Sequence, residues 1–159
     1  MAHQKPTTAI PDAVVMGRAG VDLYPTESHR SLSDVSTFRR FLGGSPSNVA
    51  VGFARLGNSA LMLTTVASDA FGDFIVEEFN RLGVDSTHIQ RTPHGHTTLA
   101  FCEIFPPDNF PLHFFRSDPA PDSYLRPEDL PLDKVAQAKI LWLTLSGLSH
   151  EPSASAHFA

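Results

Sequence analysis

The chain has 159 residues, which suits one domain with a single hydrophobic core. Its 17 acidic and 12 basic residues give a net charge of −5 without a dense Lys/Arg run, which argues against a nucleic-acid-binding protein. No apolar run approaches the roughly 20 residues that span a bilayer. The single cysteine, Cys102, excludes an internal disulfide and a multi-cysteine metal site. We therefore expect a soluble cytoplasmic protein with neither nucleic-acid nor membrane partners.

The first half of the chain alternates between strand and helix patterns. Residues 1–12 are polar and interrupted by prolines, and we expect a flexible tail there without a signal peptide. Ser45 and Pro46 open the clearest helix, which Gly57 ends, and Asp69 can cap a second helix that ends at Gly83. The predicted strands of this half are 13–16, 35–42 and 61–66. Strands and helices joined by short links indicate a parallel α/β sheet.

The second half begins with an aromatic hairpin. Residues 97–105 and 111–116 read as two strands joined through Pro106–Asn109, and five of the twelve phenylalanines of the chain fall here. A hairpin with so much aromatic surface should cover another part of the molecule. A short helix is expected within 130–138, and we expect residues 153–159 to be an irregular C-terminal end.

Ile140 to Leu145 is an apolar run that predicts an interior strand of a parallel sheet. Such a strand needs neighbours on both edges, and little sequence follows it to supply one. We therefore expect an exposed apolar edge, which recruits other chains.

The segment from Gly43 to Ala50 is the most informative for function. Two glycines let the backbone approach a ligand, and the helix that follows directs its free N–H groups toward that ligand. Asn48 can both donate a hydrogen bond to a hydroxyl and accept one from it. A tight turn before an ordinary capped helix would use the same residues, so the pattern alone leaves both interpretations open.

Several motifs in the expected order resemble the pfkB family of carbohydrate kinases. The Gly43-Gly44 pair with Asn48 and a closing Gly57 resembles the first family signature. Gly17 to Asp22 takes the place of the first strand and its sugar-binding aspartate. Asp69-Ala70-Phe71-Gly72 is similar to the usual Asp-x-Phe-Gly, and Gly83-Val84-Asp85 follows the second helix as in the family. The resemblance covers roughly residues 13–152.

The resemblance implies an α/β fold: part of a ribokinase-like three-layer sandwich with a small β-sheet lid, built from strands near 22–42 and 97–116. It also implies ATP-dependent phosphorylation of a sugar hydroxyl, with Mg²⁺. The chain lacks the Gly-Ala-Gly-Asp anion hole and catalytic base of the family, and it contains no glycine-rich nucleotide loop. We therefore expect it to supply only the acceptor-sugar half, with no catalytic base and no bound cofactor of its own. A truncated, non-catalytic product is the alternative, and a Rossmann-type enzyme lacks its glycine fingerprint.

The run Gly17 to Pro25 resembles family members that phosphorylate sugar acids. The acceptor site implied by the resemblance and by residue chemistry comprises Asp22, Gly43, Gly44, Asn48 and Arg116, with Arg18 as a second candidate for the acid. A bidentate arginine suits a planar carboxylate, although a solvated arginine at the end of a strand would look the same. A neutral sugar remains an alternative substrate, and a homodimer through the lid is an expected form of association.

Histidines and the cysteine offer weaker signals. His94 and His96, with His88 nearby, lack the clustered acids or cysteines of a metal site, so we expect no metal there. Ala67-Ser68 stands where the family signature usually ends on Gly, which leaves the effect on this turn open. Cys102 is expected to pack inside the hairpin, because no base is positioned to activate it.

Overall fold

A computed structural model describes residues 10–159, so most of the expected N-terminal tail lies outside the described residues. The central sheet has the order β4-β1-β9, and all its pairings are parallel. It consists of β1 (Ala13–Met16), β4 (Ala60–Leu63) and β9 (Ile140–Leu143). The residues of β1 and β4 are all buried, as expected for the interior of a parallel sheet.

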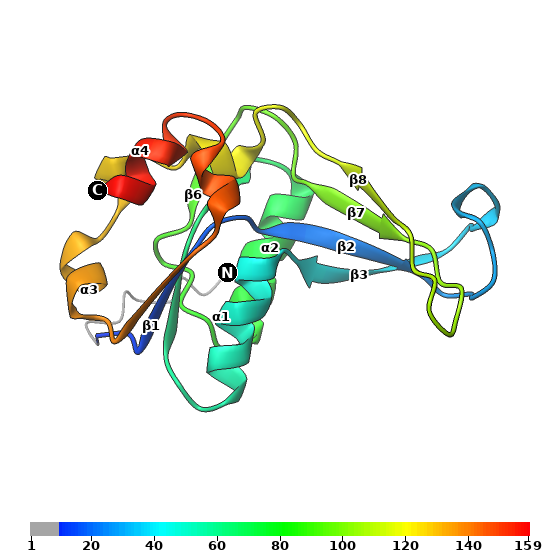
Figure 1. The fold of residues 1–159 in the computed structure, drawn as a ribbon, viewed down its shortest axis with the longest axis horizontal. Helices are drawn as coiled ribbons and strands as arrows, with labels where there is room; N and C mark the ends of the chain where they lie inside the picture. Colours follow the sequence, from blue (N-terminus) through cyan, green and yellow to red (C-terminus); the bar gives the residue numbers. More distant parts are fainter. Residues whose placement is uncertain (1–9) are drawn as a thin grey trace.

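Helical layers cover both faces of this sheet. On one face, Val15 and Met62 pack beneath α1 (Ser45–Arg55) and α2 (Ala70–Arg81). On the other face, Val14 and Leu61 pack against residues of the C-terminal third, which include Leu125 and Ala156. The three-layer α/β arrangement expected from the sequence is confirmed (Figure 1).

A second sheet extends from the body as the lid, with the order β3-β2-β7-β8 (Figure 1). Its strands are β2 (Gly20–Pro25), β3 (Phe38–Gly43), β7 (Leu99–Cys102) and β8 (Leu112–Phe115). β7 and β8 form the expected antiparallel hairpin, and β2 joins it by parallel pairing with β7. Phe101 makes edge-to-face contacts with Phe38 and Phe115, so aromatic side chains from β3, β7 and β8 pack together in the lid.

The predicted strand 61–66 is in fact divided at Thr64. β5 (Thr65–Ala67) leaves the central sheet and pairs in parallel with β6 (Gln90–Thr92), a pairing that begins with the N–H of Gln90 donating to the Thr64 carbonyl at 2.9 Å. Ala67 is the last residue of β5, and Ser68 follows it with its N–H donating to the Thr92 carbonyl at 2.8 Å.

The C-terminal end corrects one expectation. Residues 153–158 are not irregular but form the short helix α4 (Ser153–Phe158), and Ala156 on this helix is buried in the core. The His157 ring lies against Gly147, so a side chain at that glycine would require the ring to move. The remaining elements are α3 (Leu132–Gln137) and the 3₁₀ turns η1 (Leu32–Asp34), η2 (Pro121–Tyr124), η3 (Pro127–Asp129) and η4 (Leu145–Leu148). Within residues 10–159, no helix is long and apolar enough to cross a membrane.

Candidate functional site

A cavity of about 450 Å³ lies between the lid sheet and the N-terminal end of α1. Four of the six residues expected to bind a ligand line it: Arg18, Asp22, Gly44 and Asn48. Lid residues complete the wall, with Tyr24, Ala100, Cys102, Leu112 and Phe114, while Ser45 and Val49 belong to α1. The cavity therefore brings together the carboxylate of Asp22, the guanidinium of Arg18 and the amide of Asn48 beside apolar side chains. A mainly apolar lining with a few polar groups is usual for a small-molecule site.

Asp22 is the central acid of the cavity. We expected it at the end of the first strand, but β1 ends at Met16 and Asp22 lies inside β2, opposite Phe41 and Ala100. Burial raises the pKa of its carboxyl group, and the positive charge of Arg18 opposes that rise. A half-buried carboxylate of this kind can accept hydrogen bonds from ligand hydroxyls.

The two glycines support the site in different ways. A Cβ at Gly43 would lie 2.0 Å from Oδ1 of Asp22, so only glycine leaves room for that carboxylate. Gly44 has φ 98°, and a Cβ there would approach the Arg18 carbonyl to 2.6 Å. The Gly-Gly pair therefore holds both charged residues of the cavity close to the start of α1.

Arg18 and Asn48 are the other polar side chains expected here. The Arg18 guanidinium carbon lies 6.0 Å from the centre of the Phe114 ring, which directs its positive charge across the cavity toward β8. The backbone N–H of Asn48 donates to the Gly44 carbonyl at 3.0 Å, so its amide projects from the first turn of α1.

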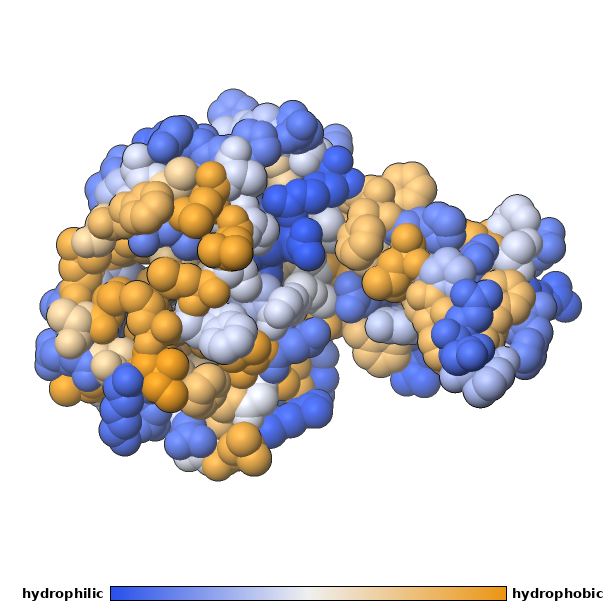
Figure 2. Space-filling view, in the orientation of Figure 1, coloured by the Kyte–Doolittle hydropathy of each residue, from blue (hydrophilic) through white to orange (hydrophobic). Residues whose placement is uncertain are grey.

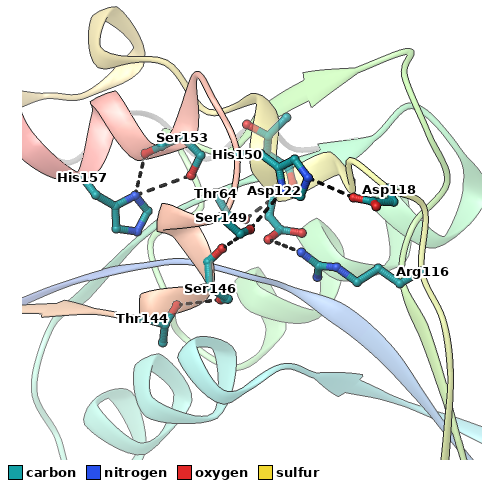
Figure 3. Close-up of polar contacts among 11 residues, drawn as sticks. Thr64, Arg116, Asp118, Asp122, Thr144, Ser146, Ser149, His150, Ser153 and His157 are labelled. Carbon is teal, nitrogen blue, oxygen red and sulfur yellow. Dashed lines mark hydrogen bonds and ion pairs between the residues drawn. The ribbon is translucent and has the colours of Figure 1, made fainter.

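Arg116 corrects the sequence interpretation. It does not line this cavity; its Nη2 donates to Oδ2 of Asp122 at 3.1 Å, in an ion pair whose Asp122 side chain is only 5% exposed (Figure 3). The strand β8 ends at Phe115, and the chain then turns away toward η2, so alternation along the strand no longer determines where Arg116 points. Arg116 lines a separate surface hollow with His96 and Thr97.

Figure 3 also shows a chain of contacts from Asp118 through His150 to Ser149. Nε2 of His150 lies 3.0 Å from Asp118, and its Nδ1 lies 3.0 Å from Oγ of Ser149. The Ser149 hydroxyl donates its proton to the Ser146 carbonyl at 2.8 Å, so the histidine is not placed to remove it. These contacts tie the C-terminal segment to the loop after β8 and do not form a hydrolytic triad.

The sequence interpretation missed several cavity residues. Tyr24 lies two positions after Asp22 on β2, and Leu112 and Phe114 share one face of β8, so strand alternation was the signal that could have found them. Cys102 is buried in the lid as expected but also reaches the cavity. Burial raises the pKa of its thiol, and the charges of Asp22 and Glu103 add to that effect.

The described residues include no cluster of side chains suited to a metal ion. Among residues 10–159, no group of three His, Cys, Asp or Glu side chains could hold a metal ion. His94 stacks on Tyr124, with ring centroids 5.3 Å apart. The cavity has one acidic side chain and no glycine-rich phosphate loop, so its residues do not fit Mg²⁺-ATP.

Fold and site together define an α/β protein with a cavity, lined by polar and apolar side chains, between a β lid and a Gly-Gly turn. The model of the pfkB family carbohydrate kinases matches residues 11–157, and the chain belongs to this family. Among curated proteins, it is 37% identical over 157 residues to the 5-dehydro-2-deoxygluconokinase of Geobacillus thermodenitrificans (strain NG80-2). It is also 37% identical over 146 residues to the enzyme of the same name from Bacillus subtilis (strain 168).

Solved structures agree on the fold. The fructokinase of Xylella fastidiosa with bound ATP is similar with a TM-score of 0.78 and 28% identity, over 93% of this chain and 46% of that one. A sugar kinase from Pyrococcus horikoshii in complex with ATP has a TM-score of 0.76 and the same identity, over 91% of this chain and 46% of that chain. The two curated relatives are matched over 98% and 91% of this chain, but the chain spans only 45% of the length of each.

Proposed function

We propose that the chain is the acceptor-binding part of an ATP-dependent kinase for a sugar acid, with 5-dehydro-2-deoxygluconate as the acceptor. This would assign the reaction to inositol catabolism in the cytoplasm. The curated relatives named 5-dehydro-2-deoxygluconokinase support the substrate. The observation that carries the proposal is the pairing of one cation, Arg18, with one acid, Asp22, in the wall of the cavity.

The two charges suit the two ends of a sugar acid. The guanidinium of Arg18 would bind the carboxylate, because its planar fork matches both oxygens. Asp22 and Asn48 would bind hydroxyls, the first as an acceptor and the second as both donor and acceptor. Arg18 therefore takes the role that the sequence had suggested for Arg116, whose guanidinium is engaged with Asp122.

Titration calorimetry with the purified chain tests these roles, using 5-dehydro-2-deoxygluconate and the neutral sugar fructose. We expect Arg18→Gln to weaken binding of the acid more than tenfold, since a charge-assisted pair is worth roughly 1.5–3 kcal/mol, and to leave fructose nearly unchanged. Asp22→Asn should weaken both sugars, because both offer hydroxyls. Arg55→Gln, at the far end of α1, is the matched control and should change neither.

A neutral-sugar kinase is the second candidate, because solved structures of similar fold include fructokinases. Equal losses for acid and fructose in Arg18→Gln would favour it over the sugar-acid proposal. Binding of 2-keto-3-deoxygluconate more tightly than 5-dehydro-2-deoxygluconate would keep the acid class but change the named substrate. Binding of no sugar at all would contradict the proposed acceptor site.

A further inference from the structure

Three residues in register across the lid form one row in the wall of the cavity. Asp22 on β2 lies opposite Ala100 on β7, and Ala100 lies opposite Phe114 on β8. Residues paired across a sheet share a face, and all three line the cavity. The row therefore runs from a carboxylate, past a methyl group, to an aromatic ring.

The two charged side chains of the cavity lie toward opposite ends of this row. Asp22 is itself one end, and the Arg18 guanidinium carbon lies 6.0 Å from the centre of the Phe114 ring at the other. Neighbouring strands are about 4.8 Å apart, so roughly 10 Å separate the backbones of Asp22 and Phe114. A ligand held by both charges therefore lies across Ala100.

The lid offers such a ligand an apolar strip beside Ala100. The side chain of Ala100 is a methyl group, and the residue is only 7% exposed. Cys102 is the next residue of β7 on this face, and its thiol donates to the Glu103 carbonyl at 3.2 Å. Leu112 and Phe114 continue the wall along β8, and Figure 2 shows apolar side chains over the part of the lid where β7 and β8 lie in Figure 1. This strip suits a carbon atom that carries no hydroxyl.

The groups that can bind hydroxyls lie elsewhere in the cavity. Ser45 and Asn48 belong to the start of α1, on the wall that faces the lid, and Asp22 lies on the neighbouring strand. A ligand hydroxyl that faces these side chains finds a partner. A hydroxyl that faces Ala100 loses its water and gains no hydrogen bond in return, which weakens binding.

We propose that the site selects acids with a methylene group next to the carboxylate, and that Ala100 determines this selection. The inference rests on the proposed function, in which Arg18 binds the carboxylate. The carbon bonded to the carboxylate then lies between the Phe114 ring and Asp22, over the Ala100 methyl. In 5-dehydro-2-deoxygluconate this carbon is C2, which carries no hydroxyl.

Comparison of two acids tests the selection in the wild-type chain. An apolar site rejects an added hydroxyl moderately, by about tenfold to a hundredfold. We expect 5-dehydro-2-deoxygluconate to bind that much more tightly than 5-dehydrogluconate, which differs by a hydroxyl at C2. Titration calorimetry measures both affinities, and this comparison needs no variant.

Ala100→Ser tests the residue, because it places a hydroxyl at the centre of the row. The serine can hydrogen-bond to a C2 hydroxyl, so the preference for the deoxy acid should fall by about fivefold or more, the worth of one hydrogen bond. Any difference between the two free acids in solution cancels, because the same pair is compared in both proteins.

Two further serine variants are the controls. Cys102→Ser adds a hydroxyl on the same face of β7 but outside the row, and it should change the preference less than Ala100→Ser. Ala54→Ser, on α1 and outside the cavity, is the matched control and should leave the preference unchanged. Thermal denaturation of each variant checks that it is folded.

Two results would overturn the inference and leave the proposed function in place. The first is equal affinity of the wild type for the two acids, while Arg18→Gln still weakens both. The second is a preference that folded Ala100→Ser retains or that Cys102→Ser abolishes in its place. Binding of neither acid would contradict the acceptor site itself, and the inference with it.

Discussion

At Gly43, a hydrogen atom is the largest side chain that leaves the Asp22 carboxylate in place. A methyl group there would lie 2.4 Å from Cγ of Asp22, while the backbone of Gly43 itself is not in the left-handed region. The glycine is therefore required by close approach and not by its own conformation. Gly43 therefore affects the cavity indirectly, because it leaves room for the Asp22 carboxylate that lines it.

We expect Gly43→Ala to move the Asp22 carboxylate and weaken sugar binding more than tenfold, while the thermal midpoint changes little. The reason is that an aspartate side chain can rotate aside at low cost but then no longer faces the cavity. Calorimetry and thermal denaturation of the same samples measure both effects.

Gly52→Ala is the control for this change. It lies inside α1 with nothing within 4 Å of the added methyl, so it should raise stability by about 1 kcal/mol and leave binding unchanged. Unaltered affinity in Gly43→Ala would contradict the role of Asp22 in the site.

Residue positions differed in how well the sequence could predict them. The Gly-Gly pair and Asn48 were found because turn and helix-start chemistry are local. Arg116 lies outside the cavity because its partner, Asp122, is a buried residue of η2, six positions further along the chain and beyond the end of β8. Strand or helix periodicity in the sequence does not predict the direction of the chain between β8 and η2.

Among the elements, α2 illustrates how a local cap also joins distant parts of the chain. Oδ1 of Asp69 accepts from the N–H of Gly72 at 2.8 Å, as the sequence predicted. The same carboxylate accepts from the hydroxyl and the N–H of Thr97, at 2.7 and 2.9 Å. This residue therefore fixes the start of α2 to the segment that leads into the lid.

We expect Asp69→Ala to destabilise the fold by roughly 1–2 kcal/mol, because it removes the cap and leaves the Thr97 hydroxyl buried without its partner. Chemical denaturation measures the free energy of unfolding. Asp73→Asn is the matched control on the same turn: its ion pair with Arg91 is exposed, so the loss should stay below about 0.5 kcal/mol. Similar losses in the two variants would argue against the cap.

The contribution of Asp69 should depend on pH in a defined direction. Burial acts to raise the pKa of this carboxyl group, but the hydrogen bonds from Thr97, Gly72 and Phe71 together lower it below 3.8. A pKa lowered by folding means stability that is present above the unfolded value and is lost as the pH falls through the folded value. The difference in stability between the wild type and Asp69→Ala should thus be constant above about pH 5 and shrink below about pH 4. A difference that is largest in acid would contradict this account.

At the scale of the whole molecule, the sequence predicted the α/β layers better than their boundaries. Strand and helix periods identified β1, α1, α2 and the β7–β8 hairpin. The split of the strand at Thr64 and the helix α4 were missed, because each depends on contacts made far away in the sequence. Within residues 10–159, β9 pairs only with β1 and its side chains are exposed, as the apolar run predicted for a strand that lacks a second neighbour there.

The last expectation concerns activity of the chain as a whole. Transfer of a phosphoryl group requires a cradle for the triphosphate, a metal ion and a base that orients the acceptor hydroxyl. The described residues gather no metal-binding cluster, and the sequence contains no Gly-Ala-Gly-Asp. We expect the purified 159-residue chain to release no ADP above a protein-free control, with Mg²⁺-ATP and 5-dehydro-2-deoxygluconate. A coupled assay of ADP measures this, with the full-length Bacillus subtilis relative as the positive control. Sugar-dependent release of ADP that Asp22→Asn abolishes would show that the chain completes the reaction by itself, and the acceptor-half proposal would then be wrong.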